Sequence, residues 1–329
     1  VRFLLFWMVF GIASSIAPLF IDTTATDAAL AVSALFSVSL GLGLPVCMAE
    51  FADYTVVENR ARLGGITFLL IMGLGAFIAN FMSENITTSL LLLACWKGLG
   101  LIAFFFTSSD QKNVRKGYSV TFMSILRERS FVLYAIPWTM FSLVNFLGGP
   151  MGAKIHGEEF IYLSMIIGNV LAGVFAVAGG FLSDIIGRKR ITIVGFIMLG
   201  VGYAVLGMYP LNMFCWYFYM VTDGIAWGMF YVIFIITLWG DLAYGKPSEK
   251  YYALGGLPYL LSSFLNLSIG PFIVNAISPY AIFSFASFFL FLAVIPLMFA
   301  PETLPEKKIR ERKLRQYVDK AKKIKEKYA

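Results

Sequence analysis

Between two long apolar runs, the chain reads Gly180-Phe181-Leu182-Ser183-Asp184-Ile185-Ile186-Gly187-Arg188-Lys189-Arg190. The glycines at 180 and 187 predict a tight turn between two helices, where a side chain would crowd the neighbouring backbone. The Asp184 carboxylate can accept backbone amides at a nearby helix start, and the Arg188 guanidinium can bind a carboxylate with two N–H groups. The best partner for Arg188 is Asp241, at the end of another apolar run. We therefore predict a charged cluster that joins helix ends.

Apolar runs continue along nearly the whole chain. Of its 329 residues, 59% are hydrophobic and only 14% are charged, and the mean hydropathy is +0.79. Runs of this length can cross a hydrocarbon core, and at that depth the backbone amides must bond internally, so the runs are helices. We predict an all-α, multi-pass membrane protein whose ten spans cover residues 2–19, 28–49, 64–81, 86–106, 131–148, 160–181, 191–208, 212–239, 254–276 and 280–300.

The chain also repeats at an offset of 191 residues. Residues 58–70 lie without a gap over residues 249–261, and the Leu-Gly-Gly of 63–65 meets its own copy at 254–256. The same offset pairs Glu50 with Asp241. We therefore predict two pseudo-symmetric halves, 1–106 with four helices and 131–300 with six, separated by a linker at 107–130 and followed by a basic tail at 301–329. Two further helices of the first half are expected upstream of Val1.

Basic residues alternate between the predicted loops. Arg60 and Arg62, the linker, the 188–190 stretch, Lys246 with Lys250 and the tail are basic, while Lys154 stands alone on the opposite side. Because basic loops stay cytoplasmic, this pattern predicts a multi-pass plasma-membrane protein with a cytoplasmic carboxyl end. The net charge of +7 then reflects that bias and does not indicate nucleic-acid binding.

The 180–190 stretch resembles the signature of the major facilitator superfamily: Gly, three residues, Asp, two residues, then Gly-Arg-Lys/Arg. Pro301-Glu302-Thr303 is similar to the Pro-Glu-Thr after the last helix of sugar-porter members. The resemblance implies two helical bundles that rock around a midplane site by alternating access. It also implies a latch on the cytoplasmic side, formed by Gly180, Asp184, Gly187, Arg188, Lys189, Arg190, Asp241 and the repeat-related Glu50.

Charges inside spans are costly and point to function. One helix face of the eighth span carries Trp216, Tyr219, Asp223, Trp227 and Tyr231, which recur at three- and four-residue steps. An acid among aromatic rings can bind a cation, hydrogen-bond a polyol, or carry a proton. The alternative is a structural aspartate that bonds a hydroxyl of a neighbouring helix.

Three other groups are weaker candidates. Lys97 lies near the centre of the fourth span, where it serves either the substrate path or packing. A second stripe on one face of the fifth span suits a polar solute or simple packing, and comprises Tyr134, Trp138, Ser142 and Asn145. Asn169, Asn266 and Ser262 are further polar positions within spans. His156, beside two glutamates, is expected to be solvated.

These features favour a secondary active or facilitative transporter for a small organic solute, sugar-like or another polar metabolite. The sequence leaves open whether a proton or a sodium ion couples to transport, and whether the transporter is a uniporter or a symporter. Many proton-coupled exporters of the superfamily that the chain resembles carry an arginine in the fourth helix of the first half, ahead of a glycine-rich stretch. Residues 36–43 have the glycines and no arginine, which argues against the drug/proton antiport subtype. We find no nucleotide-binding loop, catalytic carboxylate pair or His/Cys cluster, so we do not expect the protein to be an enzyme or to need a cofactor or metal. We expect it to be a monomer in the lipid bilayer. The alternative is a truncated, non-transporting helical scaffold or receptor.

Overall fold

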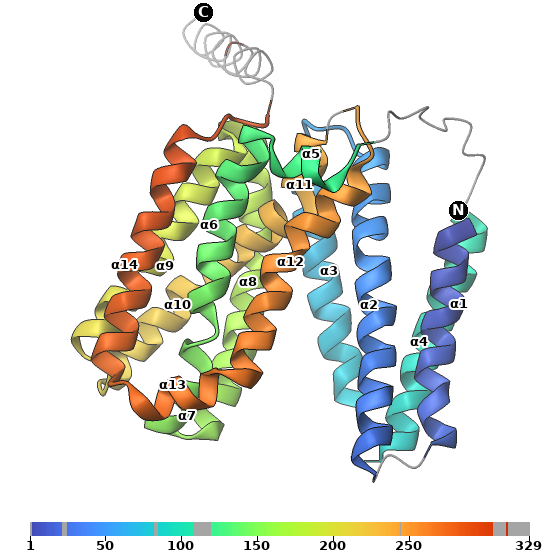
Figure 1. Cartoon of the computed structure of the whole chain (residues 1–329), viewed down its shortest axis with the longest axis horizontal. Coiled ribbons are helices and arrows are strands. Elements are labelled where there is room, and N and C mark those ends of the chain that lie inside the picture. Colours follow the sequence, from blue (N-terminus) through green and yellow to red (C-terminus); the bar gives the residue numbers. More distant parts are fainter. Residues whose placement is uncertain are drawn as a thin grey trace, which may run out of the picture.

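The computed structural model of the chain describes residues 2–21, 25–81, 85–107, 120–243 and 245–304, together with Leu314. Long helices run side by side through these residues (Figure 1). Half of the predicted linker, residues 108–119, and almost all of the predicted tail lie outside the described residues, so both remain predictions.

Within the described residues, the helices form ten passes. The first four are α1 (Arg2–Ile16) with the 3-10 turn η1 (Ala17–Phe20), α2 (Thr26–Tyr54), α3 (Arg60–Phe81) and α4 (Ile86–Thr107). After the short α5 (Phe122–Leu126) come α6 (Arg129–Asn145) continuing into α7 (Gly148–His156), α8 (Glu158–Ile186) and α9 (Arg188–Met208). The last three are α10 (Met213–Phe230) continuing through the π-helical turn η2 (Tyr231–Thr237) into α11 (Leu238–Leu242), α12 (Ser248–Ser268) continuing into α13 (Gly270–Ala276), and α14 (Pro279–Phe299).

Eight of these passes, counted over the described residues alone, are long and apolar enough to cross a membrane. The other two passes are α3 and α12. Their large apolar side chains point outward to a degree that would be unusual in water, for example at Leu70, Leu257 and Phe264. The prediction of an all-α, multi-pass membrane protein is confirmed.

The helix pairs that pack together repeat along with the sequence. An offset of 191 residues relates α1 to α9, α2 to α10, and α4 to α14. In the first helix group, which comprises α1–α4, α1 packs against α2 and α4. In the second helix group, which comprises α6–α14, α9 packs against α10 and α14. The repeat found in the sequence is therefore also a repeat of helix packing.

Residues 180–190 are not the loop that the sequence predicted. Helix α8 runs on to Ile186 and α9 begins at Arg188, so Gly187 alone separates them. Gly187 has φ +108°, a region that favours glycine, and its amide still bonds Ser183 O at 3.1 Å. The connection is one residue long because glycine turns the chain without a linker.

The two helix groups meet where α3 crosses α8 (Figure 1). A Cβ atom at Gly65 of α3 would overlap the carbonyl of Ala176, and one at Gly180 of α8 would overlap the carbonyl of Ala61. Glycine at both positions allows the two backbones to touch, as small residues do between membrane helices. This crossing brings the start of α3 against the end of α8.

Candidate functional site

A buried cluster of charges lies at the end of the bundle that contains α11. Arg188 Nε lies 2.8 Å from Asp241 Oδ2, and Arg188 Nη1 lies 2.9 Å from Asp184 Oδ1. All three side chains are at most 1% exposed. The predicted pairing of Arg188 with Asp241 is present, and the Arg188 guanidinium also binds Asp184, four residues earlier at the end of α8.

The first helix group supplies the rest of the cluster. Asp184 accepts the backbone amide of Arg62 at 2.9 Å, at the start of α3, as a carboxylate at a helix N-terminus is expected to do. Arg60 binds Asp241 Oδ1, and its Nη2 also donates to the carbonyl of Ala52 at 2.6 Å. Arg188 Nη2 donates to the carbonyl of Val57 at 2.6 Å. Charged side chains of α3, α8, α9 and α11 therefore meet in one place.

The segment after α14 closes this cluster. Glu302 Oε1 accepts the backbone amide of Arg188 at 2.8 Å, and Oε2 accepts that of Lys189 at 3.2 Å. Thr303 Oγ1 lies 3.4 Å from Asp241 Oδ2. The glutamate thus caps the start of α9, whose first turn contains no acid of its own.

The remaining residues of the predicted latch lie around this cluster. Lys189 is half-buried and its Nζ donates to the carbonyl of Met298 at 2.7 Å, while Arg190 is exposed. Glu50 is half-buried within α2. The buried core of the predicted latch thus consists of the two aspartates and Arg188.

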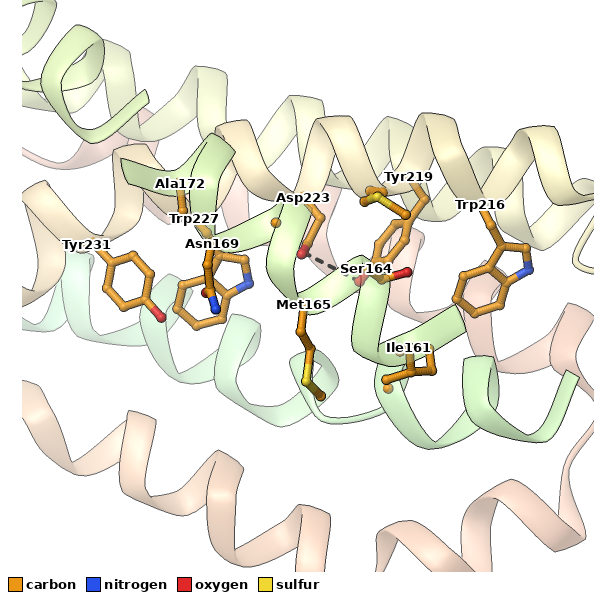
Figure 2. Close-up of a pocket in the computed structure, with 14 residues that line it drawn as sticks. Ile161, Ser164, Met165, Asn169, Ala172, Trp216, Tyr219, Asp223, Trp227 and Tyr231 are labelled. Atoms are coloured by element: carbon orange, nitrogen blue, oxygen red, sulfur yellow. Dashed lines mark hydrogen bonds between the residues drawn. The ribbon is translucent and has the colours of Figure 1, made fainter. Parts of the chain in front are cut away.

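The aromatic–acid face of α10 lines a cavity of about 190 Å³. All five residues predicted to share that face line it, and α8 supplies the opposite wall with Ser164, Met165 and Asn169 (Figure 2). Figure 2 shows Trp216 and Tyr219 to one side of Asp223 and Trp227 and Tyr231 to the other. The helical spacing therefore predicted a real cavity wall.

Asp223 is half-buried in this cavity and weakly bonded. Tyr219 Oη lies 3.4 Å from Asp223 Oδ1 and 3.2 Å from Tyr203 Oη of α9. One Tyr219 hydrogen cannot serve both neighbours, so Tyr203 donates to Tyr219 whenever Tyr219 donates to Asp223. The hydroxyl that reaches Asp223 belongs to its own helix, whereas the alternative expected a hydroxyl of a neighbouring helix; in the described residues the α9 hydroxyl of Tyr203 bonds Tyr219 instead.

The second aromatic stripe packs in the core in this structure. Trp138 is fully buried, donates Nε1–H to the carbonyl of Gly255 at 3.0 Å, and stacks on Phe234 at 4.5 Å. Tyr134 donates its hydroxyl to the carbonyl of Pro301 at 2.7 Å. Ser142 bonds the helix carbonyl of Trp138, and Asn145 is half-buried. Packing, the alternative left open for this stripe, describes what the side chains do.

Lys97 lies at a different cavity, of about 640 Å³, between α1, α2 and α4. Its Nζ donates to the carbonyl of Gly11 at 2.9 Å and to Ser15 Oγ at 2.8 Å, and it lies 5.4 Å from the Phe36 ring. Oxygens of α1 therefore hold the ammonium within the first helix group, away from the Asp223 cavity.

Several contributors were not predicted as site residues. Arg60 was counted only as a basic loop residue, and its place at the start of α3 was the available signal. Tyr203 and Ser164 had no such signal, because each contributes through a helix other than α10. Of the weaker candidates, Asn169 lines the Asp223 cavity, Ser262 is buried in α12, and the side chain of Asn266 lies outside the described residues.

The expectation of a solvated His156 is wrong. Its ring is partly buried against Phe160 and Trp216, with ring centroids 5.1 and 5.5 Å apart. The short α7 places this residue against α8 and α10, so its ring is only partly exposed to water.

Comparisons with known proteins agree with this architecture. No protein-family model matches the sequence, and no curated protein matches it. Solved structures do match the fold. The human organic anion transporter MFSD10 (TETRAN) is 15% identical to this chain with a TM-score of 0.69, over 89% of this chain and 76% of that chain. The proton:xylose symporter XylE, solved with 6-bromo-6-deoxy-D-glucose, is 16% identical with a TM-score of 0.66, over 92% of this chain and 80% of that chain.

The molecule is thus a multi-pass α-helical membrane protein whose two helix groups meet at a buried charge cluster. More specifically, it has the major facilitator fold.

Proposed function

We propose that this chain carries a small polar organic solute across the plasma membrane by alternating access between its two helix groups. The Asp223 cavity is the solute site, and the cluster around Arg188 is the gate on the cytoplasmic side. The two similar structures are both of transporters, which supports transport as the general activity.

The observation that carries the proposal is the pairing of an open cavity with a closed, charged helix junction. A cavity lined by one acid, aromatic rings, Ser164 and Asn169 can hold a polar solute within the membrane. The junction holds the two helix groups together through Asp184 and the Arg62 amide and through Arg60 and Asp241. Separation of the groups must break these contacts, so the cluster stabilises the arrangement that is closed on its own side.

Uptake into proteoliposomes tests the proposal. The full-length protein is reconstituted and offered labelled xylose, glucose, an amino acid and choline, one at a time. We expect saturable uptake of at least one solute, and its loss in Asp223→Asn. Leu260→Met, an exposed change on α12, serves as the matched control and should transport as the parent does.

The proposal fails if no solute in this panel is taken up above protein-free vesicles. It also fails if Asp223→Asn transports with unchanged kcat and KM. Saturable binding without any uptake would instead favour the receptor-like alternative. Uptake measured with and without a sodium or proton gradient then separates uniport from symport.

A further inference from the structure

Among the described residues, the cavity around Asp223 is lined by one acidic side chain and by no cationic side chain. Among its fourteen lining residues are one carboxylate and no lysine, arginine or histidine. Within the described part of the chain, the hydrogen bond that reaches Asp223 comes from Tyr219 and is long, at 3.4 Å. A carboxylate inside a membrane span is costly unless something balances its charge. A cation in the cavity would supply that balance.

The rings around Asp223 favour a cation of organic type. Trp216, Tyr219, Trp227 and Tyr231 all line the cavity from the same helix as the acid (Figure 2). The centroids of the Trp227 and Tyr231 rings are 4.8 Å apart, and those of Trp216 and Tyr219 are 5.9 Å apart. Ring faces attract ammonium and guanidinium groups, most strongly when water is excluded. The apolar body of an organic cation also gains from burial against these rings.

The same lining disfavours the other solute classes. An organic anion would meet the Asp223 carboxylate with no positive side chain to offset the repulsion. A polyol needs many hydrogen-bonding partners, and the Ser164 hydroxyl already donates to the carbonyl of Phe160 at 2.8 Å. The Tyr219 hydroxyl already lies 3.2 Å from Tyr203 Oη and 3.4 Å from Asp223 Oδ1, so the Asn169 amide is the main further partner for such bonds. These few groups orient one polar substituent more readily than they bind a whole sugar.

We propose that this cavity binds a compact organic cation: an ammonium or guanidinium group on a small apolar body, with Asp223 as counter-charge and Tyr219 and Trp227 as aromatic walls. The inference rests on the proposed transport function, since it names the solute class of the same site. The cavity volume of about 190 Å³ sets the scale of a small solute.

Equilibrium binding to the full-length protein in lipid nanodiscs tests the solute class. The probes are choline, tetramethylammonium and methylguanidinium, with 3,3-dimethyl-1-butanol as the neutral isostere of choline. We expect the cations to bind saturably and the isostere to bind at least about tenfold more weakly. Asp223→Asn should weaken choline binding by about tenfold or more, and Trp227→Leu by about 2- to 30-fold. Tyr217→Leu is the matched control, because this aromatic residue of α10 is 43% exposed and does not line the cavity.

Three results would overturn the proposal. One is equal binding of choline and its neutral isostere to the unaltered protein, a comparison that needs no variant to fold. The second is unchanged choline affinity in Asp223→Asn at an unchanged thermal midpoint. Sodium chloride that displaces choline at matching concentration would assign the site to an inorganic cation and would likewise contradict it.

Failure of this inference is distinguishable from failure of the proposed function. If the three cations do not bind while xylose or glucose uptake is saturable and depends on Asp223, the solute class is wrong and transport stands. If choline binds at Asp223 and neither choline nor any other solute of the panel crosses the vesicle membrane, the site stands and transport is wrong.

Discussion

Asp223 and Asp241 lie on the same helical pass, α10–η2–α11, in opposite electrostatic settings. Asp241 is buried between the guanidinium groups of Arg60 and Arg188, one on each carboxylate oxygen. Asp223 faces a cavity and accepts, as far as the described residues show, one long hydrogen bond, from Tyr219. Two arginines bind the Asp241 carboxylate. The Asp223 carboxylate faces a cavity in which a ligand could bind it. One helix therefore presents a structural acid at its end and a binding acid in its middle.

The helices are packed more tightly around Asp241 than around Asp223. Near Asp241, the backbones of α3 and α8 are in contact at Gly180, where a Cβ atom would overlap the carbonyl of Ala61. Near Asp223, Gly168 of the same helix α8 has open space beside it. Tight packing and paired charge characterise the proposed gate, whereas space and unpaired charge characterise the proposed site.

The largest effect should come from neutralising each acid in turn. Asp241→Asn offers one oxygen to two guanidinium groups and turns an N–H₂ group toward the other, so we expect a loss of about 3–5 kcal/mol of stability. Asp223→Asn removes a carboxylate with no cationic partner and should change stability by about 1 kcal/mol or less, in the stabilising direction. Thermal midpoints of the two variants in the same detergent give the comparison. Equal losses in both variants would show that the two acids are not different in kind.

A smaller effect should follow from adding one methyl group at either level of α8. Gly180→Ala forces α3 and α8 apart, and overpacking of this kind costs about 1–3 kcal/mol. Gly168→Ala meets no atom within 4 Å and should be neutral or stabilising by up to about 1 kcal/mol, since alanine favours helix more than glycine does. The midpoint of Gly168→Ala should therefore equal or exceed that of the parent. A loss there as large as at Gly180 would contradict the open packing at the cavity.

These comparisons also show what the sequence could predict. Helical spacing placed four residues of α10 and Tyr231 at the start of η2 on one face, and the structure finds all five at one cavity. The pairing of Arg188 with Asp241 followed from charge and helix position. The contact of Arg60 with Asp241 did not, because it joins residues 181 apart and depends on how the two helix groups dock. The Trp138 stripe shows the other limit: the same periodicity describes a packed face and a binding face, and only the neighbouring helices distinguish them.

The cap supplied by Glu302 should contribute less than the buried aspartate. Its carboxylate accepts the amides of Arg188 and Lys189 and also those of Thr303 and Leu304, at 3.0 and 3.2 Å. Glu302→Gln keeps one acceptor oxygen and loses the charge near the helix start, so we expect a cost of about 0.5–2 kcal/mol. Glu159→Gln, an exposed glutamate in the first turn of α8, should stay within about 0.5 kcal/mol. Equal midpoints for the two variants would mean that the tail segment does not stabilise the charge cluster.

Lys246 offers the weakest test, because its ion pair lies near water. Its Nζ is 2.6 Å from Glu128 Oε1, and its side chain is 41% exposed. Lys246→Met should therefore cost about 0–1 kcal/mol, well below the cost at the buried Asp241 pair.

The hydrogen bond with Glu128 raises the pKa of Lys246, and its partial burial opposes that rise. A raised pKa means that the contribution is complete below the unfolded-state value of about 10.4 and is lost as the pH rises through the folded-state value. The difference in thermal midpoint between parent and variant should thus persist at neutral pH and shrink in strongly alkaline buffer. If it stays constant there, the lysine acts through packing of its stem and not through charge, and the contrast between buried and exposed pairs at this end of the molecule would then concern Asp241 alone.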